Sequence, residues 1–550
     1  MKTKRQLIIV LLIAFLFSGF FRSDSDIYFK INKSIDIFGR VYKELSLNYV
    51  DPIDPEKLMQ SGIEGMLESL DPYTNFIDDV HQKDIDIITK GTYGGIGATV
   101  GLRNDNITIV DLIEGYSAQR QGMRIGDVII RVDSVDVSKD NYETLSELLK
   151  GEPGTLVTVT VKREGSSEPI VFNLVREDIE IKNLSYYGFY PENSNNAYLK
   201  LSGFSRSAGE EVKKALIELG GKKEIKSIVL DLRGNPGGLL NAAIEVAEKF
   251  LKKGDLIVSV EGRDTTQIKK YYSEEEPIAG DIKMAALIDQ GSASASEIVA
   301  GALQDHDRAV LIGENSFGKG LVQTVVPLSY NTSLKITTAR YYTPSGRSIQ
   351  RINYTDEKIL LENRKEKNGE IFKTDNNRKV YSGGGITPDS TVDNTTKSDL
   401  IQNLLAEGMF FRFATNLFNN NINTDFESLP DKFLIDKFKE YLLNSDFKYE
   451  SPSLRLIREL LKKAKSEGLS ENLIALLKNE EKNQVSALDE QIEKYGSEIA
   501  GLIREELQAR SNGRVARIIE SLKHDAQFNT ALSVLNNEKL YKKLLNPDVN

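Results

Sequence analysis

The sequence predicts a multidomain α/β protein with helical segments at both ends. Its 550 residues are too many for one hydrophobic core, so about two to four domains are expected. Strand and helix patterns alternate over residues 195–350, which is typical of helices packed on a largely buried sheet. Residues 91–178 instead carry short β-rich runs, whereas residues 27–90 and 395–550 show helical periodicity.

The composition excludes several functional classes. The net charge of −10 argues against general nucleic-acid binding, because phosphate contacts need a basic face. The chain has no cysteine, which excludes disulfides, cysteine-based zinc sites and thiol nucleophiles. The three histidines, His81, His306 and His524, lie far apart and show no metal-ligand spacing. Neither a metal nor a cofactor is therefore expected.

An export segment is expected at the N-terminus, within residues 1–25. Three basic residues, Lys2, Lys4 and Arg5, precede an uncharged and mostly apolar run from Leu7 to Phe21. The run is shorter than the ~20 apolar residues of a usual membrane span, but it is followed by no clean small-residue cleavage site. This favours an uncleaved anchor over a removed signal peptide. We expect the remaining chain to be exported, to the periplasm or cell envelope, with this segment holding it to the inner membrane.

Residues 26–90 form the next predicted region, and their pattern favours helix throughout. Apolar residues recur there at helical spacing, namely Ile37, Val41, Leu45, Leu58, Ile63, Met66, Leu67 and Leu70. Asp51-Pro52 and Asp71-Pro72 interrupt the pattern.

Residues 91–178 are predicted to form a small β-rich domain around one helix at Tyr142–Lys150. Strands are expected at Ile107–Leu112, Val128–Val132, Leu156–Val161 and Ile170–Leu174. Small β-rich domains of this kind often bind ligands along a sheet edge.

The α/β region is predicted to cover residues 179–392. Its strands are expected at Ala197–Leu201, Ser227–Leu232, Met284–Ile288 and Ala309–Ile312, with a closing β-rich stretch at Leu321–Tyr342. Its helices are expected at Ala208–Leu219, Leu239–Leu251 and Ser296–Leu303. An active site is expected where strands end and turn into helices. The charged segment 352–383 is predicted to be a surface insertion, and residues 393–550 a charged all-helical extension.

The segment Gly291–Glu297, Gly-Ser-Ala-Ser-Ala-Ser-Glu, follows one of these strands and opens a helix. Ser294 would lie on a sharp turn beside backbone N–H groups that the helix leaves free, where a developing oxyanion is favoured. Ser294 and Glu297 also fit a helix capping box, and the segment alone favours that structural role. The alanines on either side favour a nucleophile, because small side chains let a substrate approach the backbone closely.

A nucleophilic serine needs a base, and no histidine is well placed in the sequence. A lysine can act as the base if burial lowers its pKa. Lys319 lies between two glycines in Ser316-Phe-Gly-Lys-Gly320, which suggests a tight, apolar site, although a surface lysine explains this segment alone more simply. In a strand, Gln323 would share a face with Lys319 and hold its amine by a hydrogen bond.

The segment Asp231-Leu-Arg-Gly-Asn-Pro-Gly-Gly238 likewise follows a buried strand and precedes a helix. Its glycines permit inward-pointing N–H groups, which suit the wall of an oxyanion hole. An ordinary strand-to-helix turn explains the segment equally well.

Two nucleotide-binding patterns are incomplete. Gly313-x-x-x-x-Gly318-Lys319 continues with Gly320 where a phosphate-binding loop needs Ser or Thr, and a strand follows where a helix is needed. In Gly94-Gly-Ile-Gly97 the third glycine lies at the wrong spacing for a dinucleotide-binding loop, and no βαβ unit follows. A nucleotide ligand is therefore not expected.

Together these motifs resemble those of the C-terminal processing peptidases, also called tail-specific proteases. The matching segments, in family order, are Asp231–Gly238, Gly291–Glu297, Phe317–Gly320 with Gln323, Ala339–Gln350 and Gly385–Asp389. The resemblance covers residues 27–392. It implies a serine endopeptidase with a Ser–Lys catalytic pair, a crotonase-like α/β protease core and an inserted PDZ domain over residues 91–178. It also implies cleavage of protein substrates near their C-termini.

The resemblance assigns roles in the protease core. The middle serine of the Ser-Ala-Ser-Ala-Ser run, Ser294, is the implied nucleophile, Lys319 the base and Gln323 the residue that positions it. The implied oxyanion hole consists of backbone N–H groups of Ala295 and of Gly237 or Gly238.

In the PDZ domain, the four residues after Tyr93 resemble the loop whose N–H groups bind a terminal carboxylate. They are Gly94, Gly95, Ile96 and Gly97. The resemblance further implies that this domain gates the active site.

Some features depart from the family pattern. Ser316 stands where the family usually has Thr, and segment 352–383 interrupts a usually short path. Residues 393–550 have no counterpart in the resemblance, so either an accessory or oligomerisation domain or a docking surface is expected there. The expected partners are protein or peptide substrates with free C-termini, an adaptor or activator protein, the membrane and a second copy of the chain. The rival hypothesis is a non-catalytic scaffold, against which the intact Ser, Lys and Gln set argues.

Overall fold

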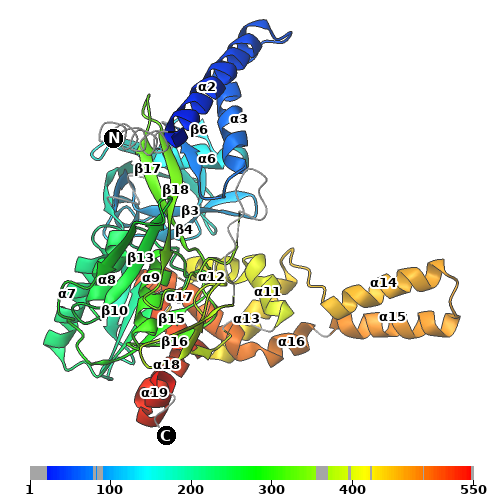
Figure 1. The fold of residues 1–550 in the computed structure, drawn as a ribbon. Coiled ribbons are helices and arrows are strands. Elements are labelled where there is room, and N and C mark those ends of the chain that lie inside the picture. Colours follow the sequence, from blue (N-terminus) through cyan, green and yellow to red (C-terminus); the bar gives the residue numbers. More distant parts are fainter. Residues whose placement is uncertain are drawn as a thin grey trace, which may run out of the picture. The chain divides into compact units, whose positions relative to one another are not determined.

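The computed structural model describes residues 22–78, 82, 91–352, 354, 369–393, 398–421, 424–486 and 488–546 (Figure 1). The chain divides into a smaller unit (residues 1–82, 323–337 and 353–364) and a larger unit (residues 83–322, 338–352 and 365–550). Residues 1–21, which contain the apolar run of the predicted export segment, lie outside the described residues. Among the described residues, no helix is both long and apolar enough to cross a membrane.

The smaller unit contains two helices, α2 (Arg22–Asn48) and α3 (Pro55–Glu68). α3 begins after Asp54, whose carboxylate accepts the N–H of Glu56 at 3.0 Å, and Pro55 has no N–H to satisfy at the first helical position. None of the residues of α3 is buried.

The prediction of helix throughout residues 26–90 is wrong near the end of that region. Asn75–Ile77 form strand β1, which pairs antiparallel with residues 333–335 of β18 (Ser333–Tyr342). The Asp71 carboxylate accepts the N–H groups of Tyr73 at 2.9 Å and Thr74 at 3.0 Å. This turn uses the donors that a continuing helix would need, so the chain leaves it extended.

A β-rich module opens the described part of the larger unit. Its main sheet has the order β3-β4-β5-β7-β8, with β6 beside β5, and β2 pairs with β9. The elements are β2 (Thr92–Gly95), β3 (Ala98–Arg103), β4 (Asn106–Leu112), α5 (Ser117–Arg120), β5 (Val128–Val132), β6 (Val135–Asp136), α6 (Tyr142–Leu149), β7 (Leu156–Lys162), β8 (Ile170–Val175) and β9 (Glu177–Glu180). The predicted helix and all four predicted strands are confirmed within one or two residues. The glycine-rich and short strands β2, β3, β6 and β9 were not predicted.

A six-stranded sheet follows in the order β10-β11-β12-β15-β16-β21. Its strands are β10 (Leu184–Phe189), β11 (Asn196–Leu201), β12 (Ser227–Asp231), β15 (Lys283–Ile288), β16 (Val310–Gly313) and β21 (Ser390–Thr391). All neighbours pair in parallel except β10 with β11. The parallel order explains why β12 is buried along its whole length, since parallel sheets are covered on both faces.

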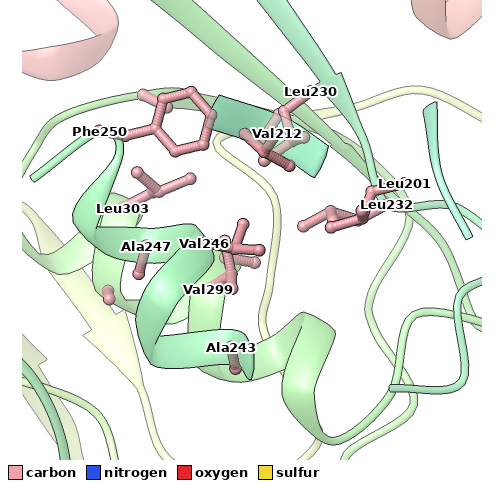
Figure 2. Close-up of a cluster of buried hydrophobic side chains, with 14 of the residues drawn as sticks. Leu201, Val212, Leu230, Leu232, Ala243, Val246, Ala247, Phe250, Val299 and Leu303 are labelled. Atoms are coloured by element: carbon pink, nitrogen blue, oxygen red, sulfur yellow. The ribbon is translucent and has the colours of Figure 1, made fainter. Parts of the chain in front are cut away.

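Three predicted helices cover one face of this sheet: α7 (Ala208–Lys222), α8 (Leu240–Glu248) and α9 (Ala295–Asp305). Figure 2 shows this core, in which Leu230 of the sheet and Val212, Val246 and Val299 of the helices belong to one cluster.

The other face of the sheet is covered by the C-terminal end of the chain, so the predicted C-terminal helical region 393–550 also contributes to the core of the protease region. α18 (Ala526–Asn536) and α19 (Glu538–Leu545), red in Figure 1, pack on the sheet. Strand residues alternate between the two layers: Leu230 belongs to the cluster with α7–α9, and Val229 to the cluster with Phe528. The sequence pattern showed the three helices of one layer, whereas the helices of the second layer lie far along the chain.

The remaining residues of the extension form a helical body with its own core. Its helices are α11 (Asp399–Ala406), α12 (Met409–Asn420), α13 (Asp431–Leu443), α16 (Leu488–Lys494) and the first part of α17 (Gly496–Leu522). α14 (Pro452–Ser466) and α15 (Glu471–Ser486) lie side by side as a hairpin (Figure 1). α17 is interrupted at Gly513, whose φ of 80° is not helical, and its last turns join the cluster on the sheet.

In the larger unit, β13 (Leu256–Gly262) pairs antiparallel with β14 (Ile268–Tyr272). β17 (Leu321–Pro327) pairs with β18. Within the larger unit, β13 pairs antiparallel with residues 339–342 of β18.

The predicted surface insertion 352–383 is only partly described, and its described part is not simply superficial. β19 (Ile371–Lys373) and β20 (Lys379–Tyr381) form a hairpin. Arg378, just before β20, is 8% exposed and pairs with Asp307 and with Asp389.

Removing the Phe528 side chain is expected to destabilise the larger unit. The ring is fully buried and meets the Tyr198 ring edge-on, with a 5.3 Å centroid separation, so Phe528→Ala leaves a cavity between α18 and the sheet. We expect a loss of about 3–5 kcal/mol in the free energy of unfolding, measured by calorimetry. Leu476→Ala, at a side chain on α15 that is 68% exposed, is the control and should change it by less than about 0.5 kcal/mol. Equal effects of the two variants would show that α18 is not a core layer.

Candidate active site

Ser294 occupies the sharp turn between β15 and α9. Its φ of 55° and ψ of −111° lie in a region that non-glycine residues rarely adopt. Such a conformation costs on the order of 1–3 kcal/mol and persists only where surrounding contacts hold it. The turn places Ser294 immediately before the first helical residue, Ala295, as the sequence pattern predicted.

A buried carboxylate, that of Glu297, holds this turn. It accepts the Ser294 N–H at 2.8 Å. The Glu297 N–H donates in return to the Ser294 carbonyl oxygen at 2.9 Å. The capping alternative considered for this segment is therefore present, through the Glu297 carboxylate and the Ser294 backbone. Ser294 itself stays partly exposed, so capping does not exclude a chemical role.

The same carboxylate also holds the segment that contains Lys319. Glu297 Oε1 accepts the Ser316 hydroxyl at 2.5 Å and the Gly318 N–H at 2.7 Å, and Oε2 accepts the Lys319 N–H at 2.9 Å. Burial raises the pKa of Glu297 to about 7, against the lowering effect of the four hydrogen bonds that it accepts. One carboxylate thus fixes the backbones of both Ser294 and Lys319.

Tyr341 on β18 provides a second connection between the two segments. Its hydroxyl lies 3.1 Å from the Ser294 carbonyl oxygen and also contacts the Lys319 carbonyl oxygen. The Tyr341 side chain is 1% exposed, so this connection is shielded from water. The backbones of Ser294 and Lys319 are therefore held next to each other by two independent buried groups.

Two expectations about the surroundings of Lys319 are wrong. Phe317 is 43% exposed and does not bury the lysine, which is itself partly exposed. Lys319 also precedes β17, which begins at Leu321, so it does not share a strand face with Gln323. The Gln323 side-chain amide donates to Thr337 Oγ1 at 3.3 Å.

The glycine loop after β12 lies against the serine turn. A Cβ atom on Gly237 would lie 2.9 Å from Ser294 Cβ and 2.7 Å from the Ala293 carbonyl oxygen, so only glycine permits this approach. Gly237 has a φ of 98°, and Gly238 is similarly restricted because a Cβ there would lie 2.4 Å from the Phe204 carbonyl oxygen.

The Gly237 N–H already has an acceptor within the loop, because it donates to Asn235 Oδ1 at 2.9 Å. The expectation that the Gly237 N–H faces an oxyanion therefore does not fit this conformation, which leaves Gly238 and Ala295 of the predicted donors. A Cβ on Gly237 would also lie 2.9 Å from the Ala295 nitrogen, so the structure places Gly237 next to both Ser294 and Ala295.

The sequence analysis did not assign roles to Asn235 or Tyr341, and it gave Glu297 only a capping role. Asn235 is fully buried, and its carbonyl oxygen accepts the Ala293 N–H at 3.0 Å and the Ser296 hydroxyl at 2.9 Å. It thereby ties the glycine loop to the serine turn. The available signal for Glu297 was its place in the first turn of α9, whereas no local signal marked Tyr341, which lies in strand β18.

The start of the glycine loop is anchored by a buried ion pair. Arg233 donates to Asp231 through Nε at 2.9 Å and Nη2 at 2.6 Å, and the Tyr198 hydroxyl and Lys200 also reach Asp231. Asp231 is completely buried, and burial alone would raise its pKa. The Arg233 and Lys200 charges nevertheless hold the pKa of Asp231 well below its usual range, so the carboxylate stays ionised.

The predicted carboxylate loop lies in the β-rich module, around the end of β2. Gly94 and Gly95 belong to β2, and Gly97 has a φ of 77° with no room for a Cβ, which would lie 2.4 Å from Tyr116 Cβ. The Ile96 carbonyl oxygen accepts the Ala118 N–H at 3.0 Å. The Gly97 carbonyl oxygen accepts the Ile113 N–H at 2.9 Å. These bonds fix the loop against the module.

β3 follows this loop directly and is an edge strand of its sheet. The Tyr142 hydroxyl at the start of α6 donates to the Val100 carbonyl oxygen of β3 at 3.3 Å. The loop, the strand edge and the first turn of α6 therefore border one region, which is the arrangement needed to add an extended peptide as a further strand.

The described part of the chain contains no group of three or more His, Asp or Glu side chains arranged to hold a metal ion.

Comparison with known protein families assigns three parts of the chain. Residues 195–357 match the model of peptidase family S41, residues 94–173 that of the PDZ domain, and residues 400–535 that of the C-terminal helical domain of probable PDZ-proteases. The protease match contains the serine turn and the Lys319 segment.

Two curated proteins illustrate the similarity. The carboxy-terminal-processing protease of Bartonella bacilliformis is 39% identical over 331 residues, which are 60% of this chain and 75% of that protein. The carboxy-terminal processing protease CtpB of Bacillus subtilis is 32% identical over 321 residues, covering 58% of this chain and 66% of that protein. Among solved structures, a photosystem II D1 C-terminal processing protease is 27% identical over 64% of this chain and 85% of its own, with a TM-score of 0.36.

The stability of the protein is expected to depend on pH through Glu297. Its pKa of about 7 in the folded state lies above its usual value of 4.5, so the folded state binds this proton more tightly than the unfolded chain. Raising the pH from about 4.5 to above 7 therefore lowers the free energy of unfolding by about 3 kcal/mol. Between pH 5 and pH 8, the melting temperature measured by calorimetry should fall by more for the native protein than for Glu297→Gln, which lacks this titrating group. Parallel pH dependences would contradict this account.

Proposed function

The chain belongs to peptidase family S41, as a carboxy-terminal-processing serine protease with a PDZ domain, and from that premise we propose that Ser294 and Lys319 are its catalytic pair. The resemblance seen in the sequence and the predicted fold class, a crotonase-like α/β serine protease core with a PDZ domain and a C-terminal all-α extension, are thereby confirmed. The observation that carries the proposal is the pair of buried connections, Glu297 and Tyr341, that hold the two backbones next to each other.

In the proposed mechanism, the neutral Lys319 amine takes the proton from the Ser294 hydroxyl as Ser294 Oγ attacks the carbonyl carbon of the scissile peptide. The carbonyl oxygen becomes an oxyanion, which the N–H groups of Ala295 and Gly238 stabilise. The lysine returns the proton to the leaving amine, and an acyl-enzyme remains. Water then attacks the ester, gives its proton to Lys319, and Ser294 is regenerated when the acid leaves. Because the base acts in its neutral form, cleavage is expected to rise with pH.

Gln323 is assigned the role of orienting the lysine amine. The support for this role is the resemblance of Phe317–Gly320 and Gln323 to the family motif. In this conformation the Gln323 side-chain amide donates to Thr337 Oγ1. Gly237 is assigned a different role from the one first expected. As a glycine, it allows the loop to approach Ser294 closely, and Gly238 then supplies the donor.

The substrates are proposed to be proteins or peptides recognised by a free C-terminus. The loop Gly94–Gly97 would bind the terminal carboxylate, and the edge of β3 would bind the preceding residues as an added strand. The fixed loop, the edge strand β3 and the first turn of α6, whose Tyr142 contacts β3, support this assignment. The names of the relatives from Bartonella bacilliformis and Bacillus subtilis, which describe carboxy-terminal processing, agree with cleavage near that end.

We also propose that the protein is exported and works in the periplasm or cell envelope, held to the inner membrane by residues 1–25. The basic residues and the apolar run Leu7–Phe21 support this. We propose that the C-terminal helical region, including the α14–α15 hairpin, binds an adaptor or activator protein or a second copy of the chain. The exposed Leu456 of α14 and Leu476 of α15 are the apolar side chains that such a partner would cover.

Replacing either member of the catalytic pair is expected to abolish cleavage. On an unfolded model protein with an apolar C-terminus, the protein lacking residues 1–25 should cut, whereas Ser294→Ala and Lys319→Ala should be slower by about 10³-fold or more. Lys465→Ala, at an exposed lysine of α14, is the control and should cut normally. Substantial cleavage by purified Ser294→Ala would refute the assignment, and binding without cleavage by the native protein would favour the scaffold hypothesis.

A free carboxylate at the substrate terminus is expected to be required for capture. Binding to the Ser294→Ala protein should weaken at least about tenfold when the same peptide carries a C-terminal amide, because a charged acceptor contributes about 1.5–3 kcal/mol to its hydrogen bonds. Fluorescence anisotropy with a labelled peptide measures this. Equal affinities for the acid and the amide would remove the carboxylate role from Gly94–Gly97.

A further inference from the structure

The C-terminal helix α18 reaches into the environment of the glycine loop. Asp525, immediately before α18, pairs with Arg233 through Oδ2 at 2.6 Å. Gln527, in the first turn of α18, accepts from Arg233 Nη1 at 3.0 Å through Oε1. Arg233 lies four residues before Gly237, so these contacts act on the segment that approaches Ser294.

The contacts of Arg233 divide between the loop and the helix. Nε and Nη2 donate to Asp231, whereas Nη1 donates to Gln527 and Nη2 also reaches Asp525. The side chains of Arg233 and Asp525 are each 10% exposed, and Gln527 is fully buried. Gln527 is itself fixed, because its amide donates to the Val392 carbonyl oxygen at 2.8 Å.

Asp525 adds a second acid to the ion pair of Arg233 and Asp231. Asp231 and Asp525 are the two acids, and Arg233 and Lys200 are the two bases within 3.3 Å of Asp231. Without the Asp525 carboxylate, Arg233 would keep Asp231 and Gln527 but would lose one of its two charged partners in a water-poor site. The start of the glycine loop would then lose one of the contacts that fix its position.

We propose that Asp525 and Gln527 are positioning residues for the peptidase reaction, which act through Arg233 to set the place of the Gly237–Gly238 loop beside Ser294. This inference rests on the proposed function, since it takes that loop as one wall of the oxyanion hole. The start of α18 then supports the geometry of the active site in addition to covering the sheet.

A merely structural role for Asp525 makes a different prediction. Asp525 also caps α18, because its Oδ1 accepts the Phe528 N–H at 3.0 Å. Asn is as good a helix cap as Asp, so Asp525→Asn keeps the cap and the packing of Phe528 while removing the charge that Arg233 meets. Asn537, whose Oδ1 accepts the Leu540 N–H at 3.1 Å, caps the next helix α19 in the same manner, so Asn537→Ala perturbs the helical layer without touching Arg233.

The test compares kcat and KM of the full chain, Asp525→Asn, Gln527→Ala and Asn537→Ala on one peptide substrate. The Gly238 N–H stabilises the oxyanion in the transition state, so displacing its loop should affect catalysis more than substrate binding. Asp525→Asn should therefore lower kcat at least about tenfold while KM changes less than about twofold. Gln527→Ala should lower kcat in the same way. The double variant Asp525→Asn/Gln527→Ala should cost less than the product of the two single effects, because both act through one guanidinium.

Two results would overturn the inference. One is a native kcat for Asp525→Asn; the other is a loss of kcat in Asn537→Ala as large as that in Asp525→Asn at matched melting temperature. Ser294→Ala separates this failure from that of the proposed function. If Ser294→Ala still cleaves, the proposed function fails, whereas an inactive Ser294→Ala beside a native-like Asp525→Asn overturns the positioning role alone.

Discussion

The buried carboxylate of Glu297 is the interaction on which the rest of the site depends. Four donors from two segments of the chain converge on its two oxygens: the N–H of Ser294, the hydroxyl of Ser316, and the N–H groups of Gly318 and Lys319. A buried carboxylate is costly unless its hydrogen bonds are satisfied, and here three of the four bonds also fix a backbone position. The strained conformation of Ser294 is held by this group and by the Tyr341 hydroxyl, which meets the same two segments from β18.

A second constraint is the parallel sheet, which has to be covered on both faces. The helices that follow the strands directly, α7 to α9, cover one face, and the serine turn and the glycine loop lie at the strand ends beneath them. The other face is closed by α18 and α19 from the end of the chain. Asp525, immediately before α18, forms an ion pair with Arg233 at the start of the glycine loop. The helical layer on this face of the sheet therefore also contacts the loop beside Ser294.

Much of this organisation could be predicted from the sequence, because it depends on local signals. Apolar periodicity located α7, α8, α9 and the strands between them, and small residues around Ser294 located the turn. The parts that could not be predicted depend on contacts distant in sequence. No local pattern shows that Phe528 packs on Tyr198 or that the Gly237 N–H donates to Asn235. Nor does a local pattern show that β17 begins only after Lys319. β1 was mistaken for helix because its strand partner lies more than two hundred residues away, on β18.

The most direct test of the account is the labelling of the intact protein with a fluorophosphonate, which reacts only with an activated serine. Peptide mass spectrometry then identifies the modified residue. The account predicts rapid, stoichiometric modification of Ser294 that is lost in Lys319→Ala, is slowed in Glu297→Gln, and is absent after unfolding. Modification of Ser294 no faster than that of other serines, or at the same rate in Lys319→Ala, would contradict the catalytic pair on which the account is built.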